Sequence, residues 1–125
     1  MMERLGNIKK FEKSENPEEM ILAVLGGAAN VYARELGHED NMHVTIDGYS
    51  IIKDVVYKID VDSEKIVPEK KVLDTTKTDM NVPDAMLAVM AGAAKFMGSK
   101  VMILDDKVFY IKDNEVYSAK VCDDG

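Results

Sequence analysis

Two segments of this sequence are nearly the same, and this repeat is the strongest constraint on the fold. The first segment covers residues 22–31, LAVLGGAANV, and the second covers residues 87–96, LAVMAGAAKF; six of the ten aligned pairs are identical. A repeat at a fixed spacing indicates that one structural unit occurs twice. Two helices rich in alanine and glycine could also resemble each other through composition alone. The segments that follow them favour duplication.

Those following segments correspond in the same order in both copies. The aligned pairs are Ile46-Asp47 with Leu104-Asp105, Ile52-Lys53-Asp54 with Ile111-Lys112-Asp113, and Val56-Tyr57 with Val116-Tyr117. In this alignment the second copy lacks about seven residues after its helix and gains two, Asn114 and Glu115. We therefore expect repeat one at about 16–62, a linker at 63–80 and repeat two at about 81–122, in a single domain of 1–125.

Each copy begins with a predicted helix. Asn16 is a favourable N-cap and Pro17 suits the first helical position, so the first helix is expected at 17–36, ending before Gly37. The second is expected at 83–97, with Asn81 as its cap. Small residues lie in the middle of each predicted helix, Gly26-Gly27 in the first and Ala91-Gly92 in the second, and they would let other elements approach the helix backbone closely.

Predicted strands follow each helix. The first copy should contain strands at 42–46 and 49–61 around the hairpin signal Asp47-Gly48, and the second a three-strand meander at 100–104, 107–112 and 115–121. The polar linker has room for one short extended piece at 66–73. These elements predict an α+β fold: an internally duplicated α-β-β(-β) unit with pseudo-two-fold symmetry, whose two helices pack on a mainly antiparallel sheet of five to six strands.

Composition favours a globular protein outside the membrane and disfavours nucleic-acid binding. Hydrophobic residues make up 46% of the chain and charged residues 31%. The net charge is −7, whereas binding to nucleic acid or to an anionic membrane requires excess cations. The apolar runs are shorter than the ~20 residues of a membrane span. With one cysteine and no signal-peptide pattern at the start, we expect a cytoplasmic protein.

The glycines within the helices are the most distinctive candidate site. Gly26, Gly27 and Gly92 lie where glycine costs ~1 kcal/mol relative to alanine, so each needs a reason. A bare backbone lets another element come close. The sequence leaves three explanations open: packing of the helices on each other or on the sheet, an interface between subunits, or a ligand cavity.

One loop holds both histidines. His38 and His43 flank Glu39 and Asp40, a combination that a divalent transition metal could use. The loop could equally be a solvated connection between helix and strand. The acidic run at 60–64 has alternating carboxylates but lacks the central glycine and distal glutamate of an EF-hand loop, so we interpret it as a strand end.

The sequence contains no phosphate-binding loop, nucleophile elbow or redox motif. A duplicated unit without a recognisable cluster of polar catalytic residues favours a non-enzymatic domain that oligomerises, acts as an adaptor or serves as a regulatory binding domain. We expect a homodimer, a possible protein partner and no cofactor. The alternative is a small-molecule or metal-binding protein, possibly an enzyme, that uses the loop from His38 to His43.

Overall fold

The computed structural model describes residues 2–38 and 42–122, which form three α-helices and eight β-strands. In chain order the elements are β1 (Glu3–Asn7), α1 (Ile8–Glu12), α2 (Pro17–Glu35), β2 (Val44–Ile46), β3 (Gly48–Ile52), β4 (Val55–Ile59), the 3₁₀ helix η1 (Ser63–Lys65), β5 (Ile66–Asp74), α3 (Val82–Phe96), β6 (Val101–Leu104), β7 (Lys107–Lys112) and β8 (Glu115–Val121). The expected α+β class is confirmed.

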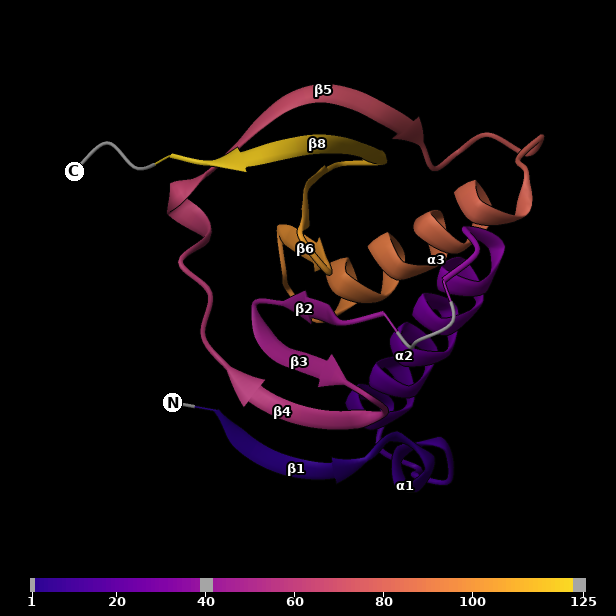
Figure 1. The fold of residues 1–125 in the computed structure, drawn as a ribbon, viewed down its shortest axis with the longest axis vertical. Coiled ribbons are helices and arrows are strands. Elements are labelled where there is room, and N and C mark those ends of the chain that lie inside the picture. The colour runs from indigo at the N-terminus through magenta and orange to yellow at the C-terminus, as the bar shows by residue number, and fades with distance from the viewer. Residues whose placement is uncertain (1, 39–41, 123–125) are drawn as a thin grey trace.

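All eight strands belong to one sheet, with the order β1-β4-β3-β2-β6-β7-β8-β5. Each pairing between these strands is antiparallel. The pair β2–β6 lies at the centre, with the strands of the N-terminal half below it and those of the C-terminal half above it in Figure 1. The two halves of the chain therefore share one continuous sheet.

Local residues define both ends of the two long helices. Asn16 and Asn81 each accept a backbone N–H from the first helical turn at 2.9 Å. At the other ends Gly37 and Gly98 have φ of 81° and 82°, a region that glycine enters without steric cost. In both cases the glycine and the residue after it donate their N–H groups back to helix carbonyls, as in a Schellman motif.

The sheet has more strands than the five to six predicted, partly because the predicted strand at 49–61 is two strands. Lys53 and Asp54 form the turn between β3 and β4 with φ of 49° and 64°, values typical of a two-residue hairpin. Ile51 consequently pairs with Val56, and both are buried. The apolar run continues through the turn, and the turn contains no glycine, so hydrophobic alternation alone does not reveal it.

The other unpredicted strand is β1, at one edge of the sheet; β5, at the other edge, corresponds to the extended piece expected at 66–73. β1 pairs with β4, and β5, within the predicted linker, pairs with β8. Most residues of both strands are exposed, so neither shows a hydrophobic pattern of its own. β4 and β8, the last strands of the two expected copies, are therefore interior strands, because β1 and β5 cover them.

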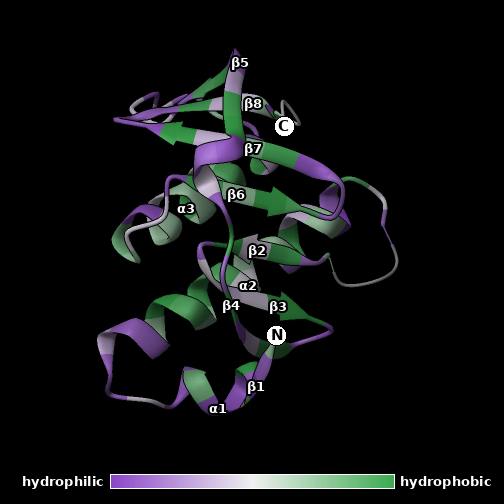
Figure 2. Ribbon diagram, turned by 90° about the vertical axis from the view of Figure 1, so that its left-hand side faces the viewer, coloured by the Kyte–Doolittle hydropathy of each residue, from purple (hydrophilic) through white to green (hydrophobic). Residues whose placement is uncertain are grey.

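The helices α2 and α3 lie side by side at the right of Figure 1 and pack against the sheet. Their buried residues join those of α1 and the strands in one hydrophobic core. Figure 2 shows hydrophobic residues along β3, β6 and β7, the central strands that contribute to this core. No helix in the described part of the chain combines the length and apolar character needed to cross a bilayer.

Candidate functional site

The three candidate glycines lie in different surroundings. Gly26 is buried, and a Cβ atom placed there would lie 3.2 Å from the side chain of Ile8 and 3.4 Å from that of Ile51. The missing side chain lets α1 and β3 approach α2 closely.

Gly27 and Gly92 are exposed, one on each long helix. A Cβ atom at either position would have no neighbour within 4 Å, so packing within the described chain does not require glycine there. Glycine within a helix costs ~1 kcal/mol relative to alanine. The bare backbone at these two positions is therefore available to a group from outside the chain.

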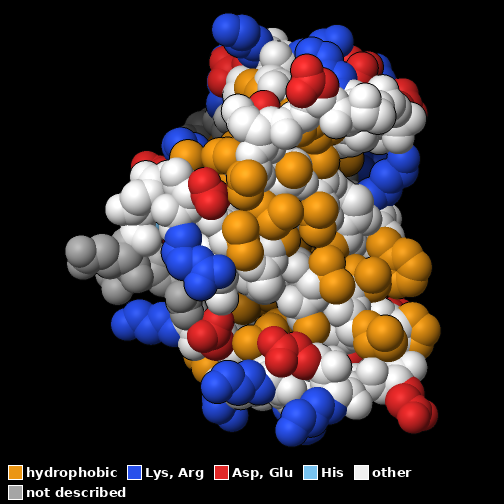
Figure 3. Space-filling model, turned by 90° about the vertical axis from the view of Figure 1, so that its right-hand side faces the viewer, with side chains coloured by type: hydrophobic (Ala, Val, Ile, Leu, Met, Phe, Trp, Pro, Cys, Tyr) orange, Lys and Arg blue, Asp and Glu red, His pale blue; other side chains and the backbone are white. Residues whose placement is uncertain are grey.

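Apolar side chains lie near both exposed glycines, and Gly92 also borders a small hollow that Thr75, Lys95, Asp113 and Asn114 help to line. Met20 and Val24 on α2 are 48% and 47% exposed, and Val89 and Phe96 on α3 are 39% and 58% exposed. The outer helix surface is defined here as the exposed residues Met20, Val24, Gly27, Val89, Gly92 and Phe96. Figure 3, which looks onto the helix side, shows hydrophobic side chains across its middle and most of the charged ones above and below.

The outer helix surface also carries little charge, although the exposed Lys95 lies between Gly92 and Phe96 on α3. No charged residue occurs between Glu19 and Arg34 on α2 or between Asp84 and Lys95 on α3. A helix of a monomeric protein normally places charged or polar residues on its solvent face. These two helices place valine, methionine, phenylalanine and glycine there, which is the composition of a contact surface.

The two histidines do not form a metal site with other described residues. His38 donates its backbone N–H to Ala33 at 2.9 Å as part of the end of α2. His43 precedes β2, and its N–H donates to the carboxylate of Asp105 at 2.9 Å. Among the described residues no group of three or more potential ligands could hold a metal ion. Glu39 and Asp40 lie outside the described residues.

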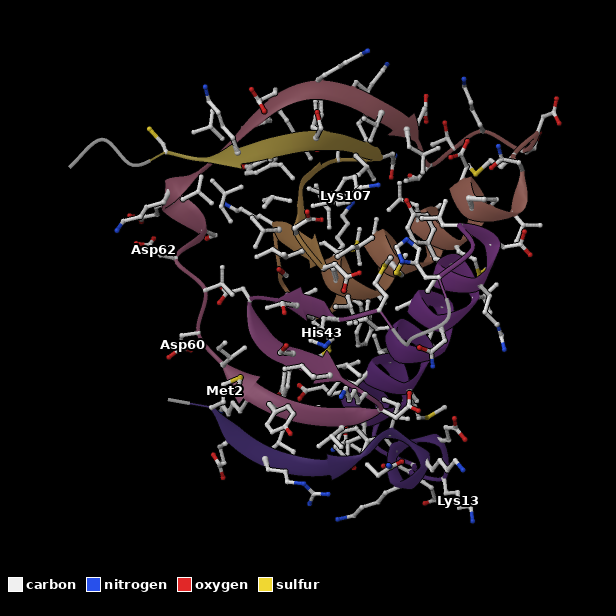
Figure 4. The ribbon with its side chains drawn as sticks, viewed as in Figure 1. Met2, Lys13, His43, Asp60, Asp62 and Lys107 are labelled. Carbon is white, nitrogen blue, oxygen red and sulfur yellow. The ribbon has the colours of Figure 1, made fainter. Side chains whose placement is uncertain are left out.

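The acidic run after β4 is also separate from the histidines. Asp62 accepts the backbone N–H of Glu64 at 3.3 Å and so caps η1. Figure 4 shows Asp60 and Asp62 on the connection from β4 to β5, remote from His43 and from the helices. This arrangement agrees with the interpretation of these carboxylates as solvated groups.

Sequence reasoning missed a cavity of about 610 Å³ between the helices and the C-terminal strands. It is lined by Tyr32 of α2, Asp84 and Leu87 of α3, Val72 of β5, Asp106, residues 107–109 of β7 and residues 118–120 of β8. Because these residues come from five elements and a turn, no local pattern in the sequence reveals it. Burial, and secondarily the nearby Asp84 carboxylate, raises the pKa of the Tyr32 phenol.

Comparisons with known proteins give no relative from which a role could be transferred. No protein-family model, curated protein or solved structure matches this chain.

Proposed function

We propose that the chain is a non-enzymatic oligomerising domain that forms a homodimer through the outer helix surface. The observation that carries this proposal is the apolar and mostly uncharged solvent face of α2 and α3, with a bare glycine near the middle of each. Charged residues are depleted at the centres of protein interfaces, and small residues allow helix backbones to approach closely.

An interface of standard size buries ~800 Å² of each partner. The outer helix surface offers large apolar side chains on both long helices, among them Met20, Val24, Val89 and Phe96, each at least 39% exposed. A second copy is the occupant that depends least on charge complementarity, because the outer helix surface is mostly uncharged even though the chain has a net charge of −7.

The proposal includes internal duplication, which several features support. The strand order reads the same from either edge of the sheet: β1-β4-β3-β2 from one side and β5-β8-β7-β6 from the other. At the centre Thr45 pairs with Ile103, the position through which a pseudo-two-fold axis would pass. Each buried residue of α3 follows a buried residue of α2 by 65 positions; the pairs are Leu22/Leu87, Leu25/Met90, Gly26/Ala91, Ala28/Ala93 and Ala29/Ala94.

The edge strands and hairpins extend this correspondence. β1 has a register irregularity at Leu5, just before Gly6, which pairs with the buried Val56 of β4. β5 has one at Val72, just before Leu73, which pairs with the buried Val116 of β8. The hairpins after β3 and β7 have equal lengths, because Ile51 pairs with Val56 and Ile111 with Val116. The two extra residues that the sequence alignment placed at 114–115 are therefore not in this turn.

The duplication also suggests how the dimer forms. Val24 and Val89 are related by the same spacing of 65 residues, as are Gly27 and Gly92, although none of the four is buried in the core. Because both helices keep a valine and a glycine at the same solvent-exposed positions, we infer that these residues contact a group from outside the chain. Under the proposed duplication the α2 and α3 parts of the outer helix surface are related by an approximate two-fold axis. Such a surface suits the self-complementary contacts of a C2 dimer.

The test is sedimentation velocity of the wild type and of Val89→Glu over a wide concentration range. The wild type should sediment as a dimer at the higher concentrations, and Val89→Glu as a monomer, because the variant places an unpaired charge in the interface. Val67→Glu on β5 is the matched control, since Val67 and Val89 are both 39% exposed.

Circular dichroism and thermal unfolding should confirm that both variants fold. A wild type that is monomeric at all concentrations would refute the dimer. If folded Val89→Glu dimerised as well as the wild type, the outer helix surface would be refuted as the interface.

A further inference from the structure

The cavity beside α3 has a floor and a rim of different chemistry. Tyr32, Leu87 and Phe109 are buried and give it an apolar floor with two aromatic rings. Its volume of about 610 Å³ lies within the range of small-molecule sites, ~300–1,000 Å³. Such sites combine an apolar interior with a few polar groups that fix the orientation of the ligand.

The corresponding place in the N-terminal half is partly filled by an aromatic side chain. There a smaller cavity of about 270 Å³ is lined by Leu5, Glu19, Leu22 and Tyr49, together with Lys10, Phe11, Asn16 and Glu18. Under the proposed duplication, Leu5, Glu19 and Leu22 correspond to Val72, Asp84 and Leu87 of the larger cavity. Phe11 is only 3% exposed and is held there by α1.

In the C-terminal half the corresponding segment, residues 75–80, supplies no equivalent aromatic side chain. Eight residues separate β1 from the N-cap of α2, and they include α1, whereas six residues separate β5 from the N-cap of α3 and form no helix. The edge strands end alike: Asn7 and Asp74 each accept the N–H of the residue two positions later, at 3.0 and 2.9 Å. The chain then takes different paths, and the larger cavity stays open.

The rim of the larger cavity carries charges of both signs in equal number. Asp84 and Asp106 supply carboxylates, and Lys107 and Lys120 supply ammonium groups. Lys120 lies 4.0 Å from Glu69, and Lys107, seen between β8 and the helices in Figure 4, has no ion pair with any described residue. Because the rim offers both signs, the carboxylate and the ammonium group of a zwitterion can each lie next to an opposite charge.

We propose that this cavity binds a small aromatic zwitterion, of which a free aromatic α-amino acid is the simplest example. The aromatic ring would take the place that Phe11 occupies in the N-terminal half. The carboxylate would lie toward Lys107 and Lys120, and the ammonium group toward Asp84 and Asp106. The correspondence between halves rests on the proposed duplication; the cavity and its charges do not depend on the proposed dimer.

The test is a titration of ¹⁵N-labelled protein with L-phenylalanine, in which the amide chemical shifts are measured at each ligand concentration. Saturable shifts should be confined to residues around the cavity, such as Val72, Val108 and Ser118. Lys107→Ala should weaken binding about tenfold through loss of a charge-assisted hydrogen bond. Lys112→Ala is the matched control, an exposed lysine on the same strand outside the cavity, and should leave the affinity unchanged.

Ligands that lack one group test the rest of the proposal. Phenethylamine, which lacks the carboxylate, 3-phenylpropionate, which lacks the ammonium group, and L-leucine, which lacks the ring, should all bind more weakly. Equal binding of any of these, absence of shifts around the cavity, or equal losses in Lys107→Ala and Lys112→Ala would overturn the proposal. Repeating the titration with Val89→Glu separates this result from failure of the dimer.

Discussion

Phe11 should be one of the most important side chains for stability, although it lies on a helix of only five residues. Phe11→Ala removes a side chain that is 3% exposed in the core. A phenylalanine buries roughly 200 Å², so at ~25 cal/mol per Å² its burial is worth at most ~5 kcal/mol. Measured Phe→Ala substitutions in cores cost ~3–5 kcal/mol, and we expect about 4 kcal/mol here.

The structural consequence should extend beyond the residue itself. A helix as short as α1 has no stability of its own in water and depends on its buried contacts. Phe11 and Ile8 are the two buried residues of α1. Loss of Phe11 should therefore release α1 and weaken the attachment of β1, which hydrogen exchange of the β1 amides would report.

The assay is urea unfolding at a protein concentration below that at which the wild type dimerises, because association of the native state adds to its apparent stability and Phe96, the control position, lies on the outer helix surface. Phe96→Ala is the control, the same substitution at a residue that is 58% exposed, and should cost about 1 kcal/mol or less. Phe11→Leu, which keeps most of the volume, should cost less than ~1.5 kcal/mol and stay folded. If Phe11→Ala costs no more than Phe96→Ala, the placement of α1 in the core is refuted.

The remaining predictions concern glycine and pH. Gly27→Ala should stabilise the monomer by about 0.5–1 kcal/mol because the new methyl group meets open space, whereas Gly26→Ala should lose this gain against Ile8; thermal unfolding at low concentration compares them. The pKa of Tyr32 is raised above its ordinary value of 10.0 by burial and by Asp84. Below pH 10 both states hold the phenol proton; above it the unfolded state loses the proton first, so stability should fall as pH rises toward the folded-state pKa. Tyr32→Phe should reduce this alkaline loss, and an unchanged pH profile in unfolding experiments would contradict it.

Several features of the fold could be predicted because they depend on neighbours in the chain. The helix caps at Asn16 and Asn81 and the helix ends before Gly37 and Gly98 follow from side-chain and backbone preferences within one turn. The strands of the C-terminal meander were also predicted within one residue. Their apolar residues alternate or cluster clearly, and their turns contain aspartate or asparagine.

Other features could not be predicted because partners distant in sequence create them. β1 is a strand because β4 offers it hydrogen bonds, and its own residues are mostly polar and exposed. The hairpin at Lys53-Asp54 depends on the pairing of Ile51 with Val56, which no local turn signal announces.

The sequence by itself determined the local elements, the repeat and the presence of bare positions in both long helices. Tertiary structure decided which of those positions are used internally. Gly26 and Gly27 are adjacent in sequence, yet successive helix positions point about 100° apart, so one meets Ile8 and the other meets solvent. Tertiary structure also decided where the cavity lies, because side chains from both helices and three strands meet there only after the sheet has formed and the helices have packed on it.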